Sequence, residues 1–205
     1  MLRIPFTDTY LDIRSFTLKK TPPIDSLNGV YCVSGFQGSG KTYYGVFLAN
    51  QLKDKYKIFT NIHSLALPHE NFTKISEAYT NFDKKTLFLI DEISNKYRRE
   101  TPTDQNFYRW LQQSRKRKSI TILITQEWKE LPTWLRRPVK VHITTSRLPL
   151  SNFTGLFRTV YGDGENLHWD KEENEYVCPP IKTIIHKRNM RIAGLYDTFE
   201  PIAEL

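Results

Sequence analysis

Short apolar and β-branched runs recur along the middle of the chain and alternate with polar stretches. Each run is bounded by glycine, polar or charged residues, a pattern that predicts buried β-strands. The expected strands cover residues 29–35, 57–62, 86–91, 119–126 and 139–145. Helical stretches separate several of these strands, so the pattern favours an α/β fold with a mainly parallel central sheet and helices on both faces.

Two segments between the strands carry apolar residues at helical spacing. Tyr44 and Leu48 belong to the first expected helix, which follows the glycine-rich turn after the first strand. Phe107 and Leu111 mark one face of the second, and Thr103 is a candidate N-cap because its hydroxyl can accept from the first turn. The two dozen residues after the second strand give only a weak pattern.

The 205 residues are enough for one α/β domain with additions. Residues 1–27 are expected to be an N-terminal leader whose Thr21-Pro22-Pro23 end connects into the domain. Residues 28–150 form the predicted core. In residues 151–205, strand-like runs alternate with Gly-Asp-Gly and Lys-Glu-Glu-Asn turns, which predicts an antiparallel, β-hairpin-like addition and a tail.

The stretch GFQGSGKT, residues 35–42, matches the phosphate-binding pattern G-x-x-x-x-G-K-[ST]. It follows an expected strand and opens an expected helix, which is the context that this loop requires, since backbone amides and the helix N-terminus then face the phosphates. Lys41 is expected to bridge the β- and γ-phosphates of ATP, and Thr42 to bind Mg²⁺. The expected nucleotide-binding residues are Gly35, Gly38, Ser39, Gly40, Lys41 and Thr42.

Two adjacent carboxylates, Asp91 and Glu92, end the apolar run LFLI. We expect the strand that carries Asp91 to lie beside the first strand, which would place its carboxylate near Mg²⁺ as a second ligand. A glutamate that follows the magnesium acid can orient a water molecule and accept its proton as it attacks the γ-phosphate. Glu92 is therefore the candidate catalytic base.

Another polar residue, Gln126, ends the run SITILITQ. Its amide can hydrogen-bond the attacking water or the γ-phosphate, although a glutamine at a strand end is also a common surface residue. Before this strand, the segment QQSRKRKS contributes four consecutive cations at residues 115–118. Such a run is often a solvated helix end, and an arginine within it can instead reach the nucleotide of a neighbouring subunit.

The net charge of +8 suits a polyanionic partner. Exposed cations contact nucleic-acid phosphates without reading sequence. The candidate DNA-binding residues are Arg98, Arg99, Arg136 and Arg137. The loop at residues 95–103 follows Glu92 and can act as a DNA-contacting lever or be an ordinary surface loop, and Tyr97 and Trp128 can stack on bases or simply pack.

These motifs together resemble the FtsK–HerA superfamily of DNA-pumping ATPases. The stretches TNI, IDE, QQSRKRK followed by ITQ, and LPTWLRRPV are most similar to Zot-type ATPase domains of filamentous phages and to viral genome-packaging ATPases, over about residues 28–147. The resemblance implies a P-loop NTPase of the additional-strand, catalytic-glutamate type that forms a homo-oligomeric ring, a pentamer or hexamer. It also implies Gln126 as a γ-phosphate sensor and an arginine finger between subunits, for which Arg115 is the better match and Arg117 the next. We expect Arg115 to close a helix beside the strand of Gln126, near the sheet edge that carries the nucleotide.

The sequence therefore predicts an ATPase that uses ATP and Mg²⁺ to translocate double-stranded DNA, in the packaging or transfer of a viral or mobile-element genome. Zot-type proteins normally continue into a membrane span, and no run here reaches the ~18 apolar residues that a span needs. We thus expect a cytoplasmic or virion-associated protein, docked on a virion or portal protein. The alternatives are an ATP-dependent assembly or extrusion factor of the Zot type that does not pump DNA, and a nucleotide kinase. Against the kinase, an Asp-Glu pair prepares water for attack, which a kinase must exclude.

Overall fold

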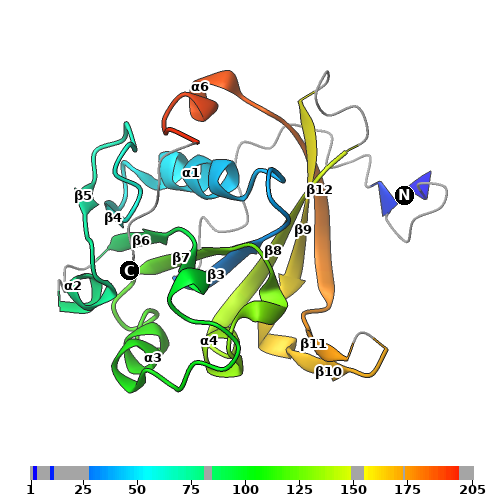
Figure 1. Ribbon diagram of the computed structural model, residues 1–205. Helices are drawn as coiled ribbons and strands as arrows, with labels where there is room; N and C mark the ends of the chain where they lie inside the picture. Colours follow the sequence, from blue (N-terminus) through cyan, green and yellow to red (C-terminus); the bar gives the residue numbers. More distant parts are fainter. Residues whose placement is uncertain are drawn as a thin grey trace.

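The computed structural model describes residues 2–3, 10–11, 28–80, 85–148, 155–172 and 174–198. Most of the leader, including the Thr21-Pro22-Pro23 connector, lies outside the described residues, as do residues 199–205 of the tail. A central β-sheet dominates the structure, with α1 on one face and α3 and α4 on the other (Figure 1). The α/β fold predicted from the sequence pattern is confirmed.

The central sheet has eight strands in the order β12-β9-β8-β3-β7-β6-β4-β5. All pairings from β8 to β5 are parallel, and β9 and β12 extend the β8 edge as antiparallel strands. The strands are β3 (Gly29–Ser34), β4 (Lys57–Thr60), β5 (Glu70–Asn71), β6 (Thr86–Ile90), β7 (Ile120–Thr125), β8 (Val139–Arg147), β9 (Leu156–Asp163) and β12 (Pro180–Lys187). Two small antiparallel pairs lie outside this sheet: β1 (Leu2–Arg3) with β2 (Tyr10–Leu11), and β10 (His168–Asp170) with β11 (Glu175–Val177).

The strand order corrects one expectation about the site. The strand that leads to Asp91, β6, does not lie beside β3, because β7 is inserted between them and pairs with both. An additional strand at this position agrees with the fold type that the resemblance implied. The sequence shows each strand but not its neighbours, so adjacency could not be deduced from the order along the chain.

Two hydrophobic cores, one on each face of the sheet, explain why these runs form strands. Successive side chains of a strand point to opposite faces. In β3, Tyr31 and Val33 enter the core beneath α1 (Lys41–Leu52), while Val30 and Cys32 enter the core that packs against α3 (Gln105–Gln112). Because both faces are covered, the parallel strands are apolar throughout rather than alternating.

The beginning of α3 differs from its predicted cap by one residue. Asp104, not Thr103, is the N-cap, and its Oδ1 accepts hydrogen bonds from the backbone amides of Asn106 at 3.1 Å and Phe107 at 3.0 Å. Both residue types are good caps. The carboxylate also accepts from the Tyr97 hydroxyl at 2.7 Å, a contact from outside the helix that local sequence does not reveal.

The remaining elements complete the layers. The weakly patterned region contains β5 and α2 (Ile75–Thr80), and β12 was not anticipated from the sequence. Short helices are η2 (Ile93–Asn95), η3 (Trp128–Glu130), α4 (Thr133–Arg136), η4 (Gly164–Asn166) and α6 (Met190–Ala193). After β12, the chain packs on α1 by means of the short helix α6. It then reaches the segment after β4, where Ala66 N donates to Leu195 O at 2.7 Å.

No helix in the described part of the chain is long and apolar enough to cross a bilayer.

Candidate functional site

The phosphate-binding loop connects β3 to α1 at the carboxyl edge of the parallel strands. Gly38 and Gly40 have φ of 73° and 90°, a left-handed conformation that glycine adopts without strain. Gly40 immediately precedes α1, so the first amides of the helix are turned toward the loop. The sequence motif therefore has the backbone shape that an anion site at a helix N-terminus needs.

Lys41 and Thr42 extend from the first turn of α1. Lys41 Nζ donates to the carbonyl of Phe36 at 3.4 Å, so its ammonium group lies against the loop, and burial lowers its pKa. Thr42 Oγ1 donates to Asp91 Oδ2 at 2.9 Å. The structure thus brings together the loop and the carboxylate that the sequence placed 49 residues apart.

Asp91 is held rigidly at the end of β6 and is only 2% exposed. Its backbone amide donates to Asn61 Oδ1 at 2.8 Å, and Asn61 Nδ2 donates to the Asp91 carbonyl at 3.0 Å. Burial raises the pKa of Asp91 from 3.8 to about 6, although the hydrogen bond from Thr42 acts to lower this pKa. Asn61 belongs to the TNI stretch of the sequence, but the sequence alone does not indicate that this residue fixes Asp91.

Glu92 has a backbone conformation that directs it away from the strand. Its φ is 50°, in the left-handed region, and its amide donates to Asp91 Oδ1 at 2.9 Å. The side chain is half-buried, and Glu92 Oε2 accepts a hydrogen bond from Asn95 Nδ2 at 3.0 Å. The two carboxylates therefore have different surroundings, one enclosed next to Thr42 and one held by the loop that follows.

Gln126 lies beside the start of the phosphate-binding loop. Its carbonyl accepts from the amide of Gly35 at 3.0 Å, and its side chain is exposed at the same sheet edge. This backbone bond joins the end of β7 directly to the loop.

The end of β8 also contacts the loop, which the sequence did not predict. Thr145 Oγ1 donates to the Ser34 carbonyl at 3.2 Å and lies 2.9 Å from Ser39 Oγ. Arg147, the last residue of β8, donates from Nε to the Gly38 carbonyl. These residues come more than a hundred positions after the loop, and only the β3–β8 pairing brings them to it.

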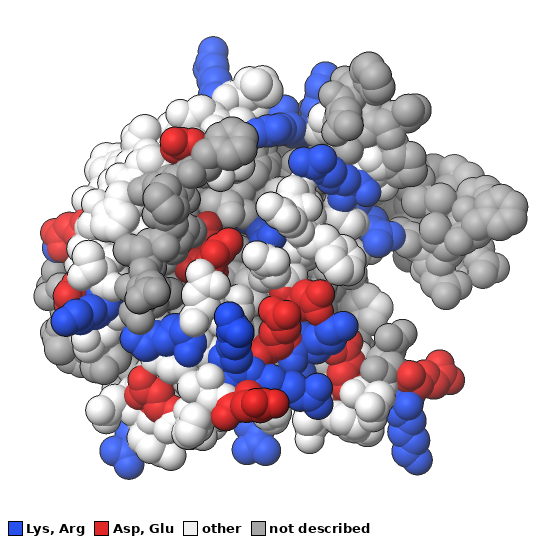
Figure 2. All heavy atoms as spheres, viewed as in Figure 1, with Lys and Arg blue, Asp and Glu red and all other residues white. Residues whose placement is uncertain are grey.

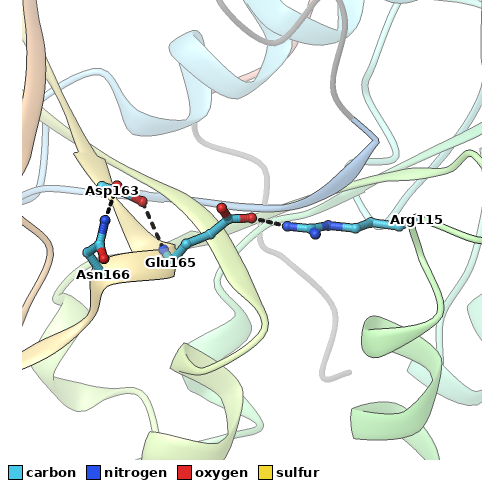
Figure 3. A network of polar contacts seen from close by, with 4 residues as sticks. All are labelled: Arg115, Asp163, Glu165 and Asn166. Carbon is cyan, nitrogen blue, oxygen red and sulfur yellow. Dashed lines mark hydrogen bonds and ion pairs between the residues drawn. The ribbon is translucent and has the colours of Figure 1, made fainter.

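Arg115 lies at the opposite edge of the sheet from the phosphate-binding loop, contrary to the expectation that it lies near the edge that carries the nucleotide. It follows α3 and precedes β7, whose first residue pairs with the first residue of β3. Its guanidinium donates to Glu165, and the two side chains point toward one another in Figure 3, where Asp163 also holds the turn that carries Glu165. Arg115 and Glu165 line a cavity of about 580 Å³.

The other candidate finger, Arg117, is engaged within its own subunit. It donates to the Trp110 carbonyl, and its guanidinium lies 4.8 Å from the centre of the Trp110 ring. Burial lowers its pKa. Of the two arginines, Arg115 is the more exposed.

The candidate DNA-binding arginines divide into exposed and buried residues. Arg98, Arg99 and Arg137 are exposed. Arg136 is only 4% exposed, and its guanidinium lies 5.8 Å from the Trp128 ring and 5.6 Å from the Tyr176 ring. Its assignment as a DNA contact was wrong, because α4 turns this arginine inward to connect with β11. Figure 2 shows Lys and Arg gathered over the α3–α4 side of the molecule, interspersed with acidic groups.

Both candidate stacking aromatics pack within the protein. Tyr97 is 3% exposed and stacks on Phe107 with ring centres 5.5 Å apart. Trp128 is 7% exposed, stacks on His142 at 4.1 Å and donates from Nε1 to the Tyr176 carbonyl at 2.9 Å. Neither ring is available to a nucleotide base.

The donor set around Thr42 and Asp91 fits Mg²⁺. A hydroxyl and a carboxylate oxygen face each other, and Mg²⁺ prefers hard oxygen ligands completed by water and phosphate oxygens. Asp91 is deeply buried, and among the described residues its carboxylate accepts from the Thr42 hydroxyl and the Glu92 amide, so a divalent cation would compensate the charge that burial disfavours.

Comparisons with known proteins agree with this geometry. The family model described as "ATPase family associated with various cellular activities (AAA)" matches residues 31–147. The N-terminal domain of zonular occludens toxin from Neisseria meningitidis aligns with a TM-score of 0.61 at 20% identity, covering 84% of this chain and 100% of that domain. The genome-packaging NTPase B204 from Sulfolobus turreted icosahedral virus 2 aligns with a TM-score of 0.53 at 14% identity, covering 78% and 96% of the two chains.

At these identities the two structures are similar to this chain in fold. No curated protein matches the chain.

Proposed function

The chain belongs to the ATPase family associated with various cellular activities (AAA), and we propose that it uses ATP hydrolysis to translocate double-stranded DNA. The favoured role is packaging or transfer of a viral or mobile-element genome by a homo-oligomeric ring. The net charge of +8 and the fold shared with a genome-packaging NTPase support this role.

The residues of the site divide the hydrolytic work. Lys41 and the loop amides bind the phosphates, while Thr42 and Asp91 would hold Mg²⁺, which neutralises phosphate charge when bound. Glu92 accepts a proton from the attacking water, and Gln126 orients that water or the γ-phosphate. The contact of Asp91 with Thr42 and the hydrogen-bonded position of Glu92 suit these different tasks.

One observation carries the link to DNA: the 3.0 Å hydrogen bond between Asn95 Nδ2 and Glu92 Oε2. Asn95 begins the loop that presents Arg98 and Arg99 to solvent. Tyr97, between Asn95 and the arginines, packs on Phe107, so one short segment connects the catalytic carboxylate with the exposed cations. A DNA phosphate bound to the arginines would shift Asn95 and thereby release Glu92 to act on water.

The loop is also supported from α4, which limits how it can move. Trp134 Nε1 donates to the Thr101 carbonyl at 3.1 Å, and Arg98 N donates to Thr101 Oγ1 at 2.9 Å. The arginines are therefore presented by a folded turn rather than by an unstructured loop. A folded turn transmits displacement to Asn95 better than a loose one does.

The experiment measures ATP turnover with and without duplex DNA. We expect DNA to stimulate the parent protein, and Arg98→Ala/Arg99→Ala to bind DNA more weakly with a salt dependence flatter by about one unit of slope per lost phosphate contact. The control Lys53→Ala/Arg109→Ala removes equal charge elsewhere and should retain stimulation. Asn95→Ala should raise turnover without DNA and reduce the stimulation, since Glu92 is then already released.

Two results would contradict the proposal. Turnover that duplex DNA leaves unchanged would remove the coupling between DNA and hydrolysis. An unchanged salt slope in the double arginine variant would show that this loop is an ordinary solvated surface.

We propose that Arg115 acts on the nucleotide of a neighbouring subunit. Its side chain is 60% exposed and lies at the edge opposite its own phosphate-binding loop, so it can serve catalysis only in another subunit. Finger arginines of this kind stabilise charge on the transferred phosphoryl group. This arrangement supports a ring in which each subunit completes the site of the next.

The alternative is an ATP-dependent assembly or extrusion factor that does not pump DNA. Trp169 on β10 and Ile181 on β12 are 44% and 62% exposed, and such apolar groups suit a protein partner. Turnover stimulated by a virion protein, with no effect of duplex DNA, would favour this alternative.

A further inference from the structure

Arg147 reaches the phosphate-binding loop from outside the sequence motif. It ends β8, and β8 runs parallel to β3, so both strands finish at the same edge of the sheet. Its Nε donates to the Gly38 carbonyl, and a Cβ added at Gly38 would come within 3.0 Å of Arg147 Nη2. The guanidinium therefore lies directly against the loop, at a position where a larger residue would displace it.

Two cationic side chains contact backbone carbonyls in the first half of the phosphate-binding loop. Lys41 Nζ contacts the Phe36 carbonyl at 3.4 Å, and Arg147 contacts the Gly38 carbonyl. A hydrogen bond with an ionised donor or acceptor is roughly twice as strong as a neutral one, and a phosphate oxygen adds its own negative charge to the attraction of the cation. Both cations are thus placed to exchange a backbone carbonyl for a phosphate.

The charge and shape of Arg147 also fit a phosphate. Among the described residues, no carboxylate forms an ion pair with it. A guanidinium presents donors in a planar fork that matches phosphate oxygens. Arg147 is exposed, so its head group is free to move by the short distance between loop and ligand.

We propose that Arg147 binds the terminal phosphate of ATP within its own subunit, as a nucleotide-binding residue contributed by β8. Lys41 marks the side of the loop where the terminal phosphate lies, since a P-loop lysine reaches the β- and γ-phosphates. Arg147 contacts the carbonyl of Gly38, two residues after the Phe36 carbonyl that Lys41 contacts. The inference rests on ATP binding and is independent of the proposed movement of DNA.

The test compares affinities for ATP and ADP in the Glu92→Gln background, which keeps ATP intact during the titration. Arg147→Gln retains a neutral donor for the Gly38 carbonyl but loses the charge, whereas Arg147→Lys retains the charge. We expect Arg147→Gln to weaken ATP binding by about tenfold to a hundredfold and ADP binding much less. Arg147→Lys should recover part of the loss, and Arg109→Ala, an exposed arginine on α3, should bind both nucleotides normally.

The outcomes separate a phosphate contact from support of the loop. An equal loss of ATP and ADP affinity, or full recovery by glutamine, would show that Arg147 only shapes the loop and would overturn the proposal. Unchanged ATP affinity would overturn it as well. Thermal unfolding of each variant establishes that the comparison is made on folded protein, and no DNA is present, so failure here leaves the DNA proposal untouched.

Discussion

Asp91→Asn should stabilise the nucleotide-free protein while abolishing its use of Mg²⁺-ATP. The parent carboxylate is 2% exposed, and burial raises its pKa from 3.8 to about 6. Asparagine has nearly the same shape, and its Oδ1 can still accept from the Glu92 amide. The Thr42 hydroxyl can rotate to accept from the new amide group, so neither hydrogen bond at this position need be lost.

The size and sign of the effect follow from proton linkage. In the unfolded chain the carboxyl ionises near pH 3.8, whereas in the fold it retains its proton up to about pH 6. Each pKa unit corresponds to about 1.4 kcal/mol, so ionised Asp91 lowers the free energy of unfolding by about 3 kcal/mol above pH 6. This destabilisation decreases as the pH falls below the Asp91 pKa of the folded protein, about 6, and is lost below the pKa of the unfolded chain, 3.8. The variant should therefore exceed the parent by about 3 kcal/mol at pH 8 and match it near pH 4.

Urea unfolding of the parent and variant, without nucleotide or metal, across this pH range measures the difference. Glu92→Gln is the matched control, because it removes the same charge from the adjacent, half-buried residue. We expect the large pH-dependent gain in Asp91→Asn and only a small one in Glu92→Gln, because burial raises the pKa of Asp91 more than the Glu92 charge does. Equal stability of variant and parent at pH 8 would refute the reasoning, since Asp91 would then carry its charge in the fold without cost.

Lys41→Ala should lose both ATP binding and turnover, whereas Glu92→Gln should bind ATP and fail to hydrolyse it; hydrolysis by Glu92→Gln at the parental rate would exclude Glu92 as the base. Arg115→Ala should bind ATP but turn over about 10³- to 10⁵-fold more slowly, and mixing with Glu92→Gln should restore activity in mixed oligomers detected by native mass spectrometry. Mixed oligomers without recovered turnover would rule out a finger at Arg115. Arg136→Ala should lower the free energy of unfolding by about 2 kcal/mol through its lost ring contacts, while the exposed Arg137→Ala should change it little.

The local sequence was sufficient to predict the strand, loop and helix that bind the phosphates. The strand β3, the loop at residues 35–42 and the helix α1 follow from an apolar run, a glycine pattern and helical spacing, which act over neighbouring residues. The run ending at Asp91 was recognised for the same reason. The place of β6 in the sheet was not, because strand order is decided by crossovers that the sequence does not display.

The contributions from distant segments had no signal in the sequence. Thr145 and Arg147 end a β-branched strand and resemble any strand end until β8 pairs with β3. Arg136 and Arg137 are adjacent and chemically identical, yet one is 4% exposed and the other lies in solvent. Only the direction of the short helix α4 distinguishes them, and four residues give too little periodicity to fix that direction.

The position of Arg115 constrains how subunits can assemble if it acts as a finger. The nucleotide site occupies the carboxyl edge of the parallel strands, and Arg115 occupies the amino edge. A two-fold dimer pairs like residues at its axis, so it could place each Arg115 at the other subunit's loop only through a surface that includes both edges of the sheet. Head-to-tail contacts join unlike surfaces and close into a ring when the rotation permits.

The ion pair with Glu165 does not prevent this use of Arg115. The two side chains are 60% and 53% exposed, and ion pairs exposed to this degree contribute at most about 1 kcal/mol. A finger worth 10³ to 10⁵ in rate stabilises the transition state by about 4 to 7 kcal/mol. The gain in the transition state exceeds the cost of leaving Glu165 several-fold. If Arg115 acts as a finger, Glu165 is therefore a partner that it can leave as the neighbouring subunit reacts.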